Sequence, residues 1–205
     1  MNKGVVGLIE AKFLSLIDLI YQLIKTSSFF WITMIKNFIF WGLIASFCTL
    51  LEVMEEITAG NGLPIRKLFQ QKSLKYKGKK RLSLLTCGLM IYLGAFIILP
   101  FPASMSSTTT SIIKFAIIYL FLLTLVLFTY ISWILVKMDL SVKKTIMYAF
   151  YLMMKRFIRT IFLILIMVTL FYIAHMNFIF FIFLAPALYA YCVSLLLKKF
   201  KVAAY

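Results

Sequence analysis

The stretch "LKYKGKKRLSLLTCGLMIYLG", residues 74–94, joins the densest positive charge of the chain directly to an uncharged run. Five cations lie between Lys75 and Arg81, and no charged residue follows until Lys114. The uncharged run, residues 82–113, has 32 residues, whereas about 20 suffice to cross roughly 30 Å of bilayer hydrocarbon. The stretch therefore predicts a helix that crosses a membrane and carries its cations at one end.

The composition of the chain requires an apolar environment around it. Of its 205 residues, 64% are apolar and 14% are charged, and the mean hydropathy is +1.04. Such a chain has too few charged residues to cover a water-soluble domain of this size. Two further uncharged runs, residues 115–136 and 160–197, are each long enough for a span. The second would be about 57 Å long as one helix, so we expect it to fold back at residues 175–177.

These runs predict an all-α, polytopic helical membrane protein with a single membrane domain over residues 1–205. We expect about five transmembrane helices, over residues 28–51, 82–100, 114–136, 158–174 and 178–197. Residues 1–25 predict an amphipathic N-terminal helix, because apolar residues recur there at three- and four-residue steps. Glu10, Lys12 and Asp18 favour an interfacial position for this helix over a span. If residues 5–24 did span, the count would be six and the N-terminus would change sides.

Positive charge is distributed unevenly between the expected loops. Three segments, residues 66–81, 137–159 and 198–201, hold 17 of the 22 cations, and the expected loops at 101–111 and 175–177 hold none. Lys and Arg are enriched in cytoplasmic loops, so we expect the basic segments 52–81, 137–157 and 198–205 on the cytoplasmic side, with the C-terminus. The cations before residue 82 therefore indicate orientation. Nucleic-acid binding is disfavoured, because aromatic residues interleave poorly with these cations.

The sequence contains no arrangement typical of an active site. Asp and Glu total six, none lies within the predicted spans, and neither a metal-binding spacing nor a phosphate-binding loop occurs. We therefore expect no catalytic residue, no cofactor and no metal. Lys36 and Asn37 form a candidate intramembrane polar site, because they lie inside the predicted span 28–51. Lys36 either extends to the interface or faces a partner inside the membrane, and Asn37 can hydrogen-bond between helices.

A second candidate site consists of cations on the expected cytoplasmic side. We expect these residues to contact anionic lipid headgroups or to dock a partner: Lys75, Lys77, Lys79, Lys80, Arg81, Lys144, Lys155, Arg156 and Arg159. The last four belong to an amphipathic helix predicted over residues 141–159, capped by Asp139 or Ser141 and running into the next span. Its apolar stripe consists of Val142, Ile146, Phe150, Met153 and Phe157. Pro186 removes a backbone donor and is predicted to kink the last span.

Three stretches of the sequence form a recognisable set: "IKNFIFWGL" (residues 35–43), "MDLSVKKTIMYAFYLMMKRF" (138–157) and "FLAPALYAY" (183–191). They resemble motifs of the YesL-like family of bacterial membrane proteins, also described as domain of unknown function 624, and the resemblance covers about residues 25–200. The chain departs from the family at "FCTLLEVMEEI", where the family usually has a turn rich in Thr, Gly and Pro. The resemblance implies about five helices, a multi-pass position in a bacterial plasma membrane and an association with ATP-driven carbohydrate importers.

These observations favour one function and leave two alternatives. We expect a non-catalytic accessory or assembly subunit of a membrane transport system, whose partners are the anionic lipid bilayer and a membrane permease. The first alternative is a small transporter with a path near Lys36 and Asn37. The second is a stress or regulatory membrane protein that binds anionic lipid.

Overall fold

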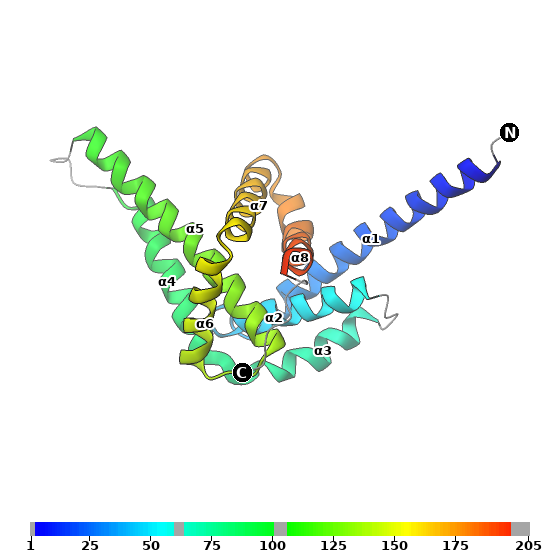
Figure 1. The fold of residues 1–205 in the computed structure, drawn as a ribbon, viewed down its shortest axis with the longest axis horizontal. Helices are drawn as coiled ribbons and strands as arrows, with labels where there is room; N and C mark the ends of the chain where they lie inside the picture. Colours follow the sequence, from blue (N-terminus) through cyan, green and yellow to red (C-terminus); the bar gives the residue numbers. More distant parts are fainter. Residues whose placement is uncertain (1–2, 60–63, 101–105, 198–205) are drawn as a thin grey trace.

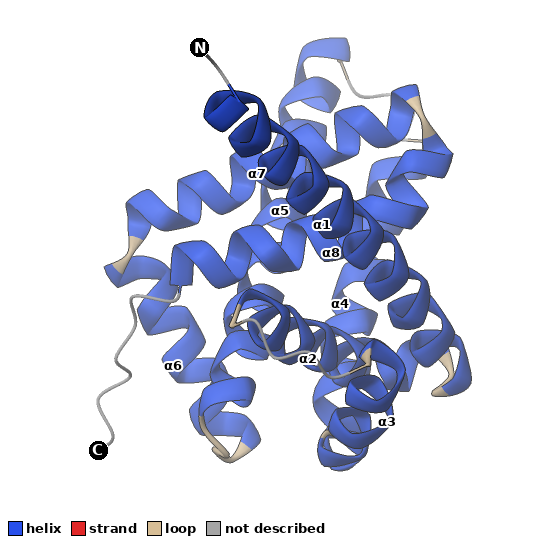
Figure 2. Ribbon diagram, turned by 90° about the vertical axis from the view of Figure 1, so that its right-hand side faces the viewer, coloured by secondary structure: helices blue, strands red, loops and turns tan. Residues whose placement is uncertain are grey.

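The computed structural model describes residues 3–59, 64–100 and 106–197, and within these segments nearly every residue is helical. Figure 2 shows helices joined by short loops, and the described residues contain no strand. The elements are α1 (Lys3–Lys36), α2 (Ile39–Thr58), α3 (Ile65–Lys75), the short 3-10 helix η1 (Lys77–Lys79), α4 (Lys80–Ile98), α5 (Ser107–Lys137), α6 (Val142–Lys155), α7 (Phe157–Met176) and α8 (Phe178–Leu197). The predicted all-α fold class is confirmed.

Helix α2 forms the centre of the molecule. It packs against α1, α3, α4, α5 and α8 (Figure 1). Every residue from Ile44 to Met54 is buried. A helix that is buried on all sides belongs to the core rather than to a surface. Glu52, Glu55 and Glu56, which directly follow the predicted first span, therefore lie in the C-terminal half of this central helix.

Four helices are long and apolar enough to cross a membrane: α4, α5, α7 and α8. Only 17% to 33% of the most apolar stretch of each is buried inside the protein. In water such helices would turn their apolar surface inward, because exposed apolar surface is unfavourable. Their exposure is therefore the arrangement of a multi-pass membrane protein, in which lipid covers the outside. The helices overlap the predicted spans 82–100, 114–136, 158–174 and 178–197.

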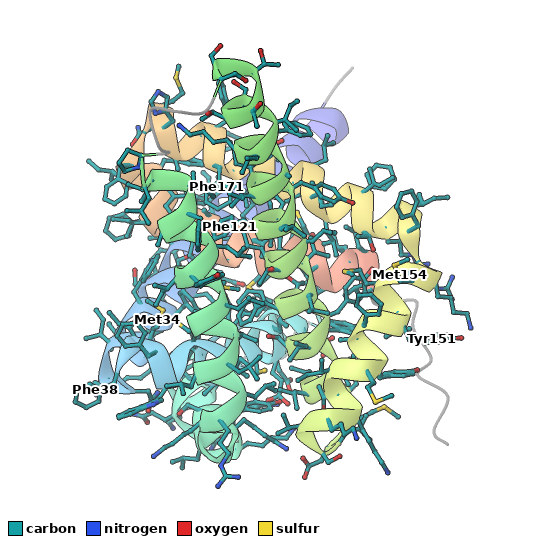
Figure 3. The ribbon with its side chains drawn as sticks, turned by 90° about the vertical axis from the view of Figure 1, so that its left-hand side faces the viewer. Met34, Phe38, Phe121, Tyr151, Met154 and Phe171 are labelled. Atoms are coloured by element: carbon teal, nitrogen blue, oxygen red, sulfur yellow. The ribbon has the colours of Figure 1, made fainter. Side chains whose placement is uncertain are left out.

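The boundaries of these four helices follow from local chemistry. Helix α5 begins before the predicted residue 114, because Ser106 caps it and accepts a hydrogen bond from the Thr109 amide at 3.3 Å. The hairpin between α7 and α8 turns at Asn177, as predicted, and the Asn177 Oδ1 accepts from the Phe180 amide at 3.1 Å. In Figure 3 the hairpin of α7 and α8 crosses behind the hairpin of α4 and α5.

The N-terminal part of the chain differs from the prediction. An amphipathic helix over residues 1–25 and a separate uninterrupted span over 28–51 were expected, and this division is wrong. Instead, α1 is one helix of 34 residues that ends at Lys36, and α2 begins at Ile39. The N-terminal half of α1 extends away from the other helices (Figure 1). The basic segment 198–205 and part of the expected loop at 101–111 lie outside the described residues.

Candidate functional site

The break between α1 and α2 is a tight hinge at Asn37 and Phe38. Phe38 has a φ of 53°, the one positive value among the described non-glycine residues. The Trp41 amide donates to the Phe38 carbonyl at 2.7 Å, which starts α2 in a new direction. The turn also requires Gly42, because a Cβ there would lie 2.7 Å from the Asn37 Cβ and 3.1 Å from the Met34 carbonyl oxygen. The hinge therefore divides the apolar run that sequence reasoning treated as one span.

The hinge places Lys36 and Asn37 at one side of a groove between α1 and α3, with a volume of about 510 Å3. Helix α3 starts after Pro64 and buries Ile65, Leu68 and Phe69. The rings of Phe29 and Phe69 stack at 5.8 Å and hold the two helices together. The groove is lined by Phe29, Ile32, Thr33, Lys36, Asn37, Arg66, Phe69, Gln70 and Ser73. The candidate polar pair thus lies at the break between two helices and lines an open groove.

A buried acidic side chain joins α2 to α3. The side chain of Glu52 is 9% exposed and accepts from the Lys75 ammonium at 2.8 Å and from the Tyr76 hydroxyl at 2.7 Å. The Lys72 ammonium lies 3.5 Å from Glu52 and 3.1 Å from Glu56. We call Glu52, Glu56, Lys72, Lys75 and Tyr76 the Glu52 cluster. In this cluster the ammonium groups of α3 neutralise the carboxylates at the end of α2, and these ion pairs stabilise the contact between the two helices.

The ionisation of the cluster follows from its contacts. Burial, together with the hydrogen bond to the Glu52 carboxylate, raises the pKa of the Tyr76 hydroxyl well above its ordinary range. Burial opposes the charged form of Lys72, but the carboxylates of Glu56 and Glu52 outweigh it and raise the pKa of the ammonium. Both groups therefore stay protonated at neutral pH.

Two further ion pairs connect the ends of α4 and α5 to their neighbours. The Lys137 ammonium contacts the Glu55 carboxylate at 2.7 Å and lies 4.8 Å from the Trp133 ring centre. The Lys79 ammonium contacts the exposed Asp139 carboxylate at 2.8 Å and lowers the pKa of that carboxyl. Asp139 thus pairs with the α4 region, and the Ser141 side chain makes no capping bond to α6.

The predicted cytoplasmic cations therefore divide into two groups. Lys75 and Lys79 are used in ion pairs within the protein. Lys80 and Arg81 are exposed, and the side chain of Lys77 lies outside the described part of the chain. Exposed Lys80 and Arg81 remain available to headgroups, whereas the paired cations mainly stabilise the fold.

Helix α6 carries the other predicted cations. The helix predicted over residues 141–159 is divided in the structure, because α6 ends at Lys155 and Arg156 leaves helical geometry with a ψ of 44° before α7 begins at Phe157. Lys144 is exposed, and the Lys155 ammonium donates to the Tyr151 hydroxyl at 3.0 Å. Arg159 lies half-buried in the first turn of α7.

The two faces of α6 have different environments. The face turned toward the protein consists of Thr145, Ala149, Leu152 and Met153. Most of the predicted apolar stripe is on the outside, where Phe150 and Phe157 are exposed. Tyr151 and Met154 point away from the bundle in Figure 3 and are 51% and 62% exposed. The helix thus presents a second apolar face to its surroundings.

Pro186 lies inside α8, which continues through it. A proline cannot donate to the carbonyl four residues earlier, here that of Ile182. The Trp31 indole of α1 donates to the Ile182 carbonyl at 2.8 Å instead. One turn earlier in α1, the Ser27 hydroxyl accepts from the Ala187 amide at 3.2 Å. The sequence did not identify Ser27 and Trp31 as the residues that contact α8, although they are four residues apart and so share a helix face.

No family model matches the chain, and no curated protein or solved structure matches it. Among the described residues, no group of three His, Cys, Asp or Glu side chains is placed to hold a metal ion. The relation to the YesL-like family therefore stays a prediction from the three motifs quoted above.

Proposed function

We propose that this protein is a non-catalytic accessory or assembly subunit of a membrane transport system, and that its partner is the permease of an ATP-driven carbohydrate importer. The outer face of α6 is the observation that carries the proposal. Helix α6 has 14 residues and is about 21 Å long at 1.5 Å per residue, too short to cross a bilayer. It nevertheless exposes Met147, Phe150, Tyr151 and Met154.

The chemistry of this face suits a protein partner. Aromatic and Met side chains are enriched at protein interfaces, because they supply large contact areas and adapt to the partner's shape. Lys143 and Lys144 lie at one end of the face and Lys155 at the other, so it also offers cations to an acidic rim on the partner. The inner face of α6 packs on α5, which holds the outer face in a fixed position. The motif resemblance supports an importer as the partner.

Co-purification with a defined partner tests the proposal. The full chain is co-expressed with the permease subunits of carbohydrate importers from the same genome, one importer at a time, and extracted in mild detergent. We expect one permease to co-purify with the chain. The Phe150→Ser, Met154→Ser double variant of the chain should no longer co-purify with that permease. Met176→Ser, at the exposed end of α7, serves as the control and should leave the complex intact. No complex with any permease, together with unchanged sugar uptake after deletion of the chain, would remove the proposal.

A further inference from the structure

The groove between α1 and α3 carries positive charge that the described part of the chain does not balance. Lys72, Lys75, Lys79 and Lys137 each contact a carboxylate within 4 Å. Lys36 and Arg66 have no ion-pair partner among the described residues, and no acidic side chain lines the described groove.

We propose that the groove binds the phosphate headgroup of an anionic phospholipid. Lys36 comes from the last turn of α1 and Arg66 from the first turn of α3, so the groove receives one cation from each wall. A phosphate oxygen accepts charge-assisted hydrogen bonds from both ammonium and guanidinium groups. The two exposed side chains can move to meet a headgroup without breaking an ion pair within the described chain.

Other polar side chains that line the groove complete the site. The Asn37 amide nitrogen donates to the Thr33 carbonyl at 2.9 Å, which leaves its Oδ1 to accept from a ligand. The Ser73 hydroxyl donates to the Gln70 carbonyl at 3.3 Å, so its oxygen is also an acceptor. The exposed Gln70 amide can both donate and accept. These acceptors match the hydroxyl groups of a glycerol-type headgroup, while the cations match its phosphate.

The apolar surface beside the groove favours a lipid over a free anion. Large apolar side chains at the hinge are exposed: Ile35 (64%), Phe38 (72%), Ile39 (49%), Phe40 (51%) and Trp41 (48%). Figure 3 shows Phe38 at the outer edge of the molecule, away from the bundle. Apolar and aromatic side chains next to cations are typical of a segment at the level of lipid headgroups. The hinge thus offers a surface for acyl chains beside a groove for phosphate, which a soluble phosphate would not use.

Native mass spectrometry of the full chain in a neutral detergent tests this site. The probes are phosphatidylglycerol and phosphatidylcholine with the same acyl chains, and inorganic phosphate is added in a separate arm. The groove variant carries Lys36→Gln and Arg66→Gln. The matched control carries Lys67→Gln and Lys143→Gln, which removes the same charge from exposed cations that do not line the groove. Both variants should fold, because none of the four side chains is buried. Thermal unfolding of each variant checks this.

We expect the wild-type protein to retain phosphatidylglycerol in preference to phosphatidylcholine. The groove variant should lose this preference by about tenfold, because two headgroup contacts are removed, and the control by less than about twofold. Inorganic phosphate should not displace the lipid. Equal losses in both variants would show diffuse attraction to the basic surface and would overturn the proposal. Displacement by inorganic phosphate would assign the groove to a soluble anion instead, and absence of any preference in the wild type would remove the site.

Discussion

The Trp31 indole nitrogen donates to the Ile182 carbonyl oxygen at 2.8 Å, across 151 residues of sequence. This carbonyl is the one that Pro186 leaves without its helical donor. Pro186 therefore creates a docking point for α1 on α8, and the Ser27 hydroxyl extends it by one turn. Neighbouring helices commonly satisfy backbone groups freed by proline in membrane helices.

Trp31→Phe should lower the free energy of unfolding by about 1–3 kcal/mol, because it leaves the Ile182 carbonyl without a donor. The measurement is a denaturation titration in mixed detergent. In a Pro186→Ala background the loss should be smaller, since residue 186 then has an N–H for this carbonyl. The lost indole area is common to both backgrounds, so the difference between them isolates the hydrogen bond. Equal losses in the two backgrounds would contradict this role for Trp31.

Gly42→Ala should destabilise the protein by about 1–3 kcal/mol, because the new Cβ overlaps the Asn37 side chain and forces the hinge to shift. Gly88 in α4 is the matched control, since a Cβ there meets nothing within 4 Å. Gly88→Ala should be stabilising by about 0.5–1 kcal/mol, as expected for a helix interior. The same titration measures both variants. If Gly42→Ala were as well tolerated as Gly88→Ala, the hinge would not depend on this close approach.

Glu52→Gln should cost about 1.5–3 kcal/mol, because it removes the charge that accepts from Lys75 and Tyr76 and weakens the contact with Lys72. Glu55→Gln is the comparison, since its pair with Lys137 has side chains that are 27% and 34% exposed. That loss should stay under about 1 kcal/mol. Comparable losses for the two variants would mean that the Glu52 cluster contributes no more than a surface ion pair.

The Glu52 cluster also predicts a pH dependence. Tyr76 and Lys72 both have raised pKa values in the folded protein, so the folded state holds their protons more tightly than the unfolded chain. The resulting stability is fully present below the ordinary pKa values of 10.0 and 10.5 and is lost as the pH rises above them. Tyr76→Phe should make this alkaline decline shallower in thermal unfolding between pH 8 and pH 12. An unchanged slope would contradict the contribution of the buried hydroxyl.

Much of the fold could be predicted from the sequence because length alone decides whether an uncharged run can span. Helices α4, α5, α7 and α8 follow from such runs, and α3 follows from Pro64 and the apolar spacing after it. The hinge was missed because Lys36 and Asn37 were treated as polar positions within one helix. Gly42 was the residue in the sequence that could have indicated the hinge. The need for glycine there is apparent only from the structure, in which residue 42 lies directly against Asn37.

The packing of α6 was also beyond the sequence pattern, for a physical reason. A helix outside the spans can turn either face toward the protein, because a partner or the headgroup region can cover large apolar side chains on its outer face. Thr145 and Ala149 face the protein in this way, while Met147 and Phe150 face outward. The contact of Trp31 with Ile182 joins two helices at opposite ends of the sequence. The spacing of apolar residues within one helix cannot predict which other helix it contacts.

The central claim is that the uncharged helices cross a bilayer and leave the basic segments on one side. Cysteine accessibility at the first residue of α4 and the first residue of α5 tests it most directly. Cys48, Cys87 and Cys192 are replaced by Ala, and single cysteines are introduced as Lys80→Cys and Ser107→Cys. A membrane-impermeant thiol reagent applied to intact cells should label only the Ser107→Cys protein, and Lys80→Cys should react only after the membrane is opened. Labelling of both positions from the outside of intact cells would contradict the claim.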